Sequence, residues 1–105
     1  MIYMGVRVTP GPGQGPALLP TVARLNELVT KHGGKPTANF AVAVGGPGSG
    51  DNVHIFGYQD WAAYGAAGEA LQADPEWQKF LAENGSKVAS VSLSILQPLP
   101  ESAIQ

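Results

Sequence analysis

The sequence predicts an α+β domain in which a four-stranded antiparallel sheet carries its helices on a single face. Two observations predict this class: strand-like alternation of apolar residues occurs near both ends of the chain, and stretches with helical spacing lie between them. Runs of glycine and proline separate these stretches, as is typical of turns. With 105 residues, the chain has room for one domain, residues 1–105.

The first strand and the first helix are separated by a run of glycine and proline. Within Ile2–Thr9, apolar residues alternate with other residues at the period of a half-buried strand. Proline and glycine fill most of residues 10–16 and end the strand. Apolar residues then recur at helical spacing over Ala17–His32. Pro20 is tolerated only in the first turn of a helix, which places the regular start near residues 17–20. Gly33-Gly34 supplies a left-handed stop.

A hairpin is predicted next. Its strands are expected at about Thr37–Val44 and at Asn52–Tyr58, where small, β-branched and aromatic residues gather. The run Gly45–Gly50 joins them and is expected to be a mobile tip, placed where it could fold over a pocket mouth. A phosphate-binding loop would lead from a strand into a helix, whereas this run leads into another strand.

Two aspartates predict a second helix that is split in two. Asp60 is placed to cap a helix that continues through about Ala73, because its carboxylate can accept from free amides of the first turn. Asp74 then caps a second piece, and Pro75 fits its first position, where no amide hydrogen is needed. This piece ends at Asn84-Gly85.

The last strand, Lys87–Gln97, alternates apolar residues with serines, so its apolar side should face the helices. The resulting order is strand, helix, strand, strand, split helix, strand. This is the order of the ferredoxin-like, or split βαβ, plan, β-α-β-β-α-α-β, with a four-stranded antiparallel sheet.

Composition excludes several classes of function. The formal net charge is −2 and lysine and arginine do not cluster, which argues against nucleic acid and membrane surfaces as partners. The chain has no cysteine, and no apolar run approaches the roughly 20 residues of a membrane span. The beginning of the chain lacks a basic segment followed by an apolar one, so a cytoplasmic protein is expected. Charged residues make up only 13%, which favours a face that meets another subunit.

Several segments together resemble the NIPSNAP-type branch of the dimeric α/β barrel superfamily, which also contains the antibiotic biosynthesis monooxygenases. The segments are Gly33-Gly34, Ala41–Pro47, Asp60–Ala66 and Leu71–Gln78, the last containing an Asp-Pro-Glu-Trp restart. The resemblance implies a homodimer in which two four-stranded sheets close into an eight-stranded barrel. It also implies that small organic ligands are held between sheet and helices or inside the barrel. Some members of the superfamily are oxygenases that use neither metal nor flavin.

His54 and Tyr58 are the candidate catalytic residues. Both fall on one face of the third strand by period-two counting, with Phe56 between them as a candidate substrate-binding residue. A neutral imidazole near a phenol suits proton transfer, because histidine titrates close to neutral pH. The alternative interpretation is that these side chains only pack within the sheet and the barrel.

Trp61 and Tyr64 are candidate substrate-binding residues because they lie three apart on a helix beside small residues, a surface suited to a flat ligand. Trp77 and Phe80 are interpreted instead as core residues. Arg7 is a further candidate substrate-binding residue; together with Asn39 and the serines of the last strand it is expected to face the barrel interior, where it would need an anionic partner.

No metal site and no cofactor are predicted, because only two histidines, 22 positions apart, and no cysteine are present. Three functional hypotheses follow. The first is a small-molecule-binding barrel protein that acts as a cofactor-independent monooxygenase, isomerase or cyclase on a small aromatic or polyketide-like compound. The second is a non-enzymatic stress or accessory protein whose cleft is filled by aromatic side chains. The third is a haem-binding or haem-degrading protein.

Overall fold

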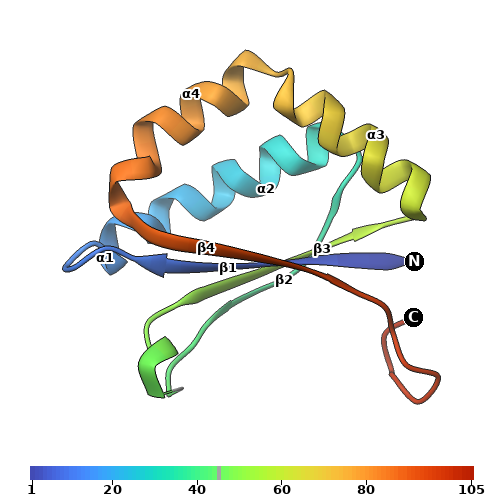
Figure 1. The fold of residues 1–105 in the computed structure, drawn as a ribbon, viewed down its shortest axis with the longest axis horizontal. Coiled ribbons are helices and arrows are strands. Elements are labelled where there is room, and N and C mark those ends of the chain that lie inside the picture. The colour runs from blue at the N-terminus through green and yellow to red at the C-terminus, as the bar shows by residue number, and fades with distance from the viewer. Residues whose placement is uncertain (45) are drawn as a thin grey trace.

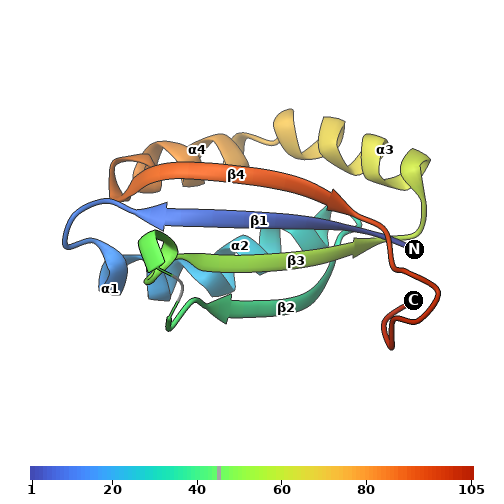
Figure 2. The same ribbon diagram turned by 60° about the horizontal axis from the view of Figure 1, so that its bottom comes forward.

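The computed structural model describes residues 1–44 and 46–105. Four strands form one antiparallel sheet: β1 (Ile2–Pro10), β2 (Lys35–Ala41), β3 (Asn52–Tyr58) and β4 (Val88–Leu96). Their order in the sheet is β2-β3-β1-β4, so β1 pairs with both β3 and β4. The helices α2 (Val22–Lys31), α3 (Trp61–Gln72) and α4 (Pro75–Asn84) lie on one face of the sheet, as Figures 1 and 2 show. The predicted ferredoxin-like plan is confirmed.

The segment after β1 forms three short pieces where one helix is expected. These are α1 (Gly15–Leu18), the 3₁₀ turn η1 (Leu19–Thr21) and then α2. Proline is the second residue of both α1 and η1. Because proline cannot donate the hydrogen bond of a helix interior, each proline fits only where a helical piece begins. The regular helix therefore starts later than the spacing of apolar residues predicts.

Both predicted caps of the split helix are confirmed. The Asp60 carboxylate accepts from the Ala63 amide at 2.8 Å, and the Asp74 carboxylate accepts from the Glu76 amide at 2.9 Å. Pro75 follows as the first residue of α4. The break lets α3 and α4 form an arch above the sheet (Figure 1).

Asp74 also ties this arch to the end of α2. One of its carboxylate oxygens, Oδ2, accepts from Lys31 Nζ at 2.9 Å and from His32 Nε2 at 2.7 Å. These hydrogen bonds, the one from Lys31 first, hold the pKa of Asp74 well below its ordinary value. His32 therefore joins the end of α2 to the start of α4 through a carboxylate.

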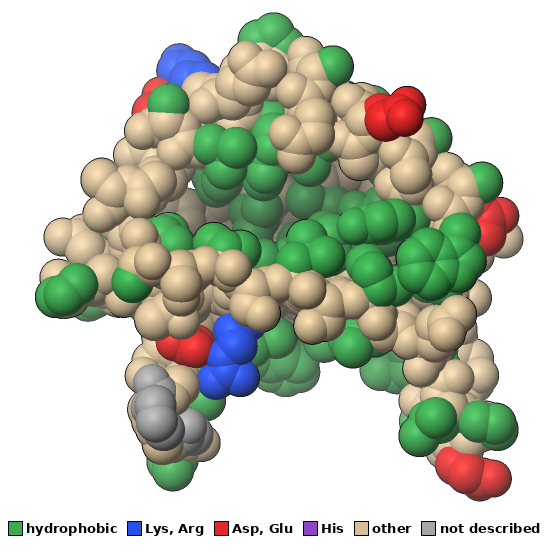
Figure 3. Space-filling view, in the orientation of Figure 1, with side chains coloured by type: hydrophobic (Ala, Val, Ile, Leu, Met, Phe, Trp, Pro, Cys, Tyr) green, Lys and Arg blue, Asp and Glu red, His purple; other side chains and the backbone are tan. Residues whose placement is uncertain are grey.

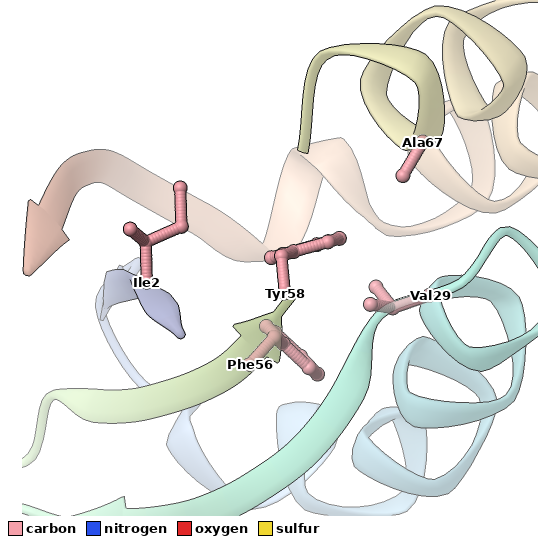
Figure 4. Packing of buried hydrophobic residues seen from close by; sticks show 5 residues of the cluster. All are labelled: Ile2, Val29, Phe56, Tyr58 and Ala67. Atoms are coloured by element: carbon pink, nitrogen blue, oxygen red, sulfur yellow. The ribbon is translucent and has the colours of Figure 1, made fainter. Parts of the chain in front are cut away.

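The small core lies at the end of the sheet where β3 meets α2 and α3. Buried side chains from four elements form it: Ile2, Val29, Phe56, Tyr58 and Ala67 (Figure 4). Phe56 and Tyr58 project from β3 toward the helices, and Leu28 is buried elsewhere in α2. The rest of the space beneath the arch is not closed by packing, and it contains the candidate site.

Candidate ligand-binding cavity

A cavity of ≈ 500 Å³ lies between the sheet and the arch of α3 and α4. Figure 3 shows it as a hollow lined by hydrophobic side chains. Its volume is within the range of small-molecule sites, about 300 to 1,000 Å³. Side chains of β1, β3 and β4 form the floor, and those of α2, α3 and α4 form the other walls. The lining includes Met4, Val6, Leu25, His54, Phe56, Tyr58, Tyr64, Gly68, Trp77, Phe80, Val91 and Leu93.

The lining is mostly apolar and, within the part of the chain that the structure describes, carries no charged side chain. No lysine, arginine, aspartate or glutamate of the described residues contributes to it. Burying a charge without a partner is strongly unfavourable, so such a cavity suits an uncharged occupant. Leu93 of β4 faces the cavity and yet is 54% exposed, because the cavity is open to water along this edge strand.

His54 is the titratable group at the centre of the cavity floor. It is 4% exposed, and burial lowers its pKa below the ordinary value of 6.5, so the imidazole is neutral at neutral pH. Its Nδ1 lies 2.8 Å from Oδ1 of Asn39 on the neighbouring strand β2. The structure thus gives His54 one fixed hydrogen bond and leaves its other nitrogen for an occupant.

Tyr58 lines the same cavity as His54, but the two do not form a pair. They are four positions apart along β3, about 13 Å, and Phe56 lies between them. The Tyr58 hydroxyl lies against the backbone of Gly34, where an added Cβ would be only 2.8 Å away. Its ring packs edge-to-face on Tyr64 at 5.3 Å, and burial, followed by Tyr64, raises the pKa of Tyr58. Tyr58 therefore closes one end of the cavity.

The aromatic residues of α3 and α4 differ from the prediction. Trp61 is 55% exposed and is not part of the cavity lining, although its ring contacts Tyr64 edge-to-face at 6.4 Å. Trp77 and Phe80, interpreted from the sequence as core, stack on each other at 5.5 Å and line the cavity. Trp77 of α4, and not Trp61 of α3, therefore contributes to the cavity.

Arg7 is on the opposite face of the sheet from the cavity. It alternates with Val6 and Val8, which line the cavity, so its own side chain points away from the helices. Its Nε donates to Asp51 Oδ2 at 2.7 Å, which lowers the pKa of that carboxyl. The anionic partner that Arg7 needs is Asp51, which precedes β3 and is brought beside β1 by the pairing of these two strands.

Asn39 also differs from the expectation that it shares a face with Arg7. The pairing of β2 with β3 shifts between Pro36 and Ala38, and beyond this bulge Asn39 lies opposite His54. Opposite residues of an antiparallel pair share a face, so Asn39 is on the helix side. Only the pairing of the strands reveals this contact, which the sequence does not indicate.

The glycine-rich tip is held near Arg7 rather than over the cavity. Gly46–Gly48 forms a 3₁₀ turn, η2, and the Gly50 amide donates to the Val42 carbonyl at 2.8 Å. An added Cβ at Gly48 would collide with the Arg7 guanidinium. Gly46, Gly48, Ser49 and Gly50 do not line the cavity; Gly45, part of the predicted tip, lies outside the described residues.

Residues 1–44 and 46–105 contain no group of three or more histidine, aspartate or glutamate side chains that could hold a metal ion. Within the same ranges, no helix has the length and apolar character required to cross a bilayer.

The fold and the cavity define the class of protein: a ferredoxin-like α+β domain with an apolar cavity between its sheet and its helices. The sequence profile of NIPSNAP matches residues 11–103. The chain belongs to the NIPSNAP family.

Solved structures have the same fold. The chain is similar to a NIPSNAP family protein from Agrobacterium tumefaciens, with 24% identity, a TM-score of 0.87 and coverage of 100% of this chain and 94% of that one. It is similar to an uncharacterized NIPSNAP domain protein from Burkholderia xenovorans, with 19% identity, a TM-score of 0.85 and coverage of 97% and 98%. An antibiotic biosynthesis monooxygenase shares 16% identity, with a TM-score of 0.64 and coverage of 95% and 100%. The sequence matches none of the curated proteins compared with it.

Proposed function

We propose that the protein binds a small, uncharged and largely apolar organic molecule in the cavity beneath α3 and α4. The observation that carries this proposal is a cavity of ≈ 500 Å³ with an uncharged, mostly apolar lining and one neutral imidazole in its floor. The non-enzymatic alternative expects the cleft to be filled by Trp61, Trp77 and Phe80. Trp61 lies outside the cleft and the other two leave it open, so that expectation is not met.

The two tryptophans provide a direct test of binding. Trp77 lines the cavity and Trp61 does not, so Trp61→Phe and Trp77→Phe variants each keep one reporter, inside or outside the site. Camphor, a neutral apolar probe, should change the fluorescence of Trp77 in a saturable way and leave that of Trp61 nearly unchanged. Camphor-10-sulfonate, an anion of similar shape, should bind far more weakly. Equal responses from both tryptophans, or stronger binding of the sulfonate, would contradict the proposal.

A finer proposal is that the bound molecule reacts by losing a proton to His54. In a cofactor-independent oxygenation, isomerisation or cyclisation, the protein removes a proton, orients the substrate and excludes water. A neutral, buried imidazole suits the first task, and the apolar walls suit the other two. If His54→Ala turns over every accepted substrate as fast as the wild type, His54 is not the base.

Haem binding has less support from the cavity. The two propionate groups of haem favour cationic partners, and no lysine or arginine of the described chain lines the cavity. Titration with haemin checks this point, because a Soret band that shifts with saturation would favour haem over a smaller neutral ligand.

The proposed assembly is a homodimer formed through the face of the sheet without helices. Phe40 on this face is 60% exposed, and Leu96 is exposed on the same face, which provides apolar surface for a partner. Sedimentation of the purified chain measures the assembly. A cytoplasmic location is part of the same proposal, and cell fractionation tests it.

A further inference from the structure

The contact between Asn39 and His54 determines which nitrogen of the imidazole carries hydrogen. The carbonyl oxygen Oδ1 of Asn39 is the atom that faces His54 Nδ1, at 2.8 Å. An amide oxygen only accepts hydrogen bonds, so Nδ1 must be the donor. In a neutral imidazole the other nitrogen, Nε2, then has no hydrogen and presents a lone pair.

Nε2 of His54 faces the cavity. It has no hydrogen-bond partner within the described part of the chain. It is accessible as well. Among the described residues, the fully buried side-chain polar atoms without a partner are Asn26 Oδ1 and Trp77 Nε1, and His54 Nε2 is not one of them. Since His54 is otherwise buried and lines the cavity, the cavity is the space that Nε2 reaches.

The contact depends on the bulge in β2. Without the shift between Pro36 and Ala38, period-two counting would place Asn39 on the other face of the sheet. A bulge leaves one residue unpaired, and it reorients the side chains that follow. Here it delivers an amide oxygen from the neighbouring strand to the imidazole of His54.

We propose that Asn39 is a positioning residue that holds His54 with Nε2 as a hydrogen-bond acceptor, and that the cavity therefore selects an uncharged ligand bearing a hydrogen-bond donor. The ligand class is a neutral alcohol, phenol, enol or amide on an apolar skeleton. This inference rests on the proposed binding function and specifies its ligand. The same arrangement directs the basic lone pair of His54 at the hydrogen that the ligand donates.

Borneol and camphor test the selectivity, because they share one carbon skeleton. Borneol has a hydroxyl group that donates a hydrogen bond, whereas camphor has a ketone that only accepts one. Calorimetric titration at about pH 8, where imidazole is neutral, should give borneol an advantage of about threefold to tenfold, the effect of one neutral hydrogen bond. His54→Leu should bind both molecules equally. Failure of both molecules to bind the wild type overturns the proposed function, whereas equal binding of both overturns only the present inference.

Variants of Asn39 test the positioning role. Asn39→Asp keeps an oxygen acceptor and should keep the preference for borneol, whereas Asn39→Leu should lose it and leave the affinity for camphor unchanged. Lys35→Gln, an exposed change on the same strand before the bulge, is the control and should behave as the wild type. Nitrogen-15 NMR of His54, assigned by comparison with His54→Leu, reads the tautomer independently of folding. It should show hydrogen on Nδ1 in the wild type and predominantly on Nε2 in Asn39→Leu; hydrogen on Nε2 in the wild type would refute the inference.

Discussion

Two glycines inside α3 allow the cost of keeping the cavity open to be measured. Gly65 and Gly68 both lie in the helix interior, where glycine is less favourable than alanine by about 1 kcal/mol. An added Cβ at either position would meet no atom within 4 Å, and neither residue has a positive φ. Alanine should therefore fit both positions without strain.

The two positions differ in what they face. Gly68 lines the cavity, whereas Gly65 is exposed and does not. Gly65→Ala and Gly68→Ala should each raise the free energy of unfolding by about 1 kcal/mol, which corresponds to a rise in Tm of roughly 4 to 8 °C for a domain near this size. Denaturant titration followed by circular dichroism measures both values. A loss of stability in Gly68→Ala would mean that the space beside this glycine is already occupied, contrary to the structure.

Leucine at the same two positions distinguishes an effect on ligand binding from an effect on stability. Gly68→Leu places an isobutyl group in the cavity and should abolish camphor binding detected through Trp77, while Gly65→Leu should bind camphor as the wild type does. Both variants should remain folded, because leucine is a good helix former. If Gly68→Leu binds camphor with unchanged affinity, the probe does not occupy this cavity.

The remaining predictions concern packing, acid stability and assembly. Leu28→Ala, at a fully buried position, should lower the free energy of unfolding by about 2 to 5 kcal/mol, whereas Leu93→Ala, on the open wall, should lower it by about 1 kcal/mol or less; urea titration compares them. The hydrogen bond from Lys31 lowers the pKa of Asp74 in the folded protein below its ordinary value of 3.8. The ionised carboxylate therefore stabilises the fold at pH values above 3.8, and this contribution is lost as the pH falls toward the pKa of the folded state. Asp74→Asn should accordingly be less stable at pH 7 and show a weaker loss of stability below about pH 4 in acid titrations; an unchanged pH dependence would contradict this assignment. Phe40→Asp should shift the sedimentation coefficient toward that of a monomer, and an unaltered dimer would show that the interface lies elsewhere.

Local chemistry made the element order and the caps predictable. Asp60 and Asp74-Pro75 act through neighbouring amides, so their roles follow from a few consecutive residues. The alternation in β3 likewise predicted that His54, Phe56 and Tyr58 share one face, and the three do line one cavity.

The rest of the site depends on contacts between distant segments. Arg7 and Asp51 are 44 positions apart, and the antiparallel pairing of β1 with β3 brings them together. The position of Asn39 depends on a bulge, which inverts period-two counting beyond it. Trp77 lines the cavity and Trp61 does not, a difference that depends on how α3 and α4 lie over the sheet and that helical periodicity does not reveal.

The composition of β4 has a consequence for the handling of the protein. This strand lies at one edge of the sheet, and its sequence, Val88–Leu96, contains neither a charged residue nor a proline. The opposite edge, β2, begins with Lys35-Pro36, residues that discourage pairing with another strand. A long, uncharged and apolar edge is a template for intermolecular strand pairing, so β4 is the segment from which aggregation of an isolated subunit would start. A lysine in place of Ser92, whose side chain faces away from the cavity, would interrupt that template without entering the ligand site.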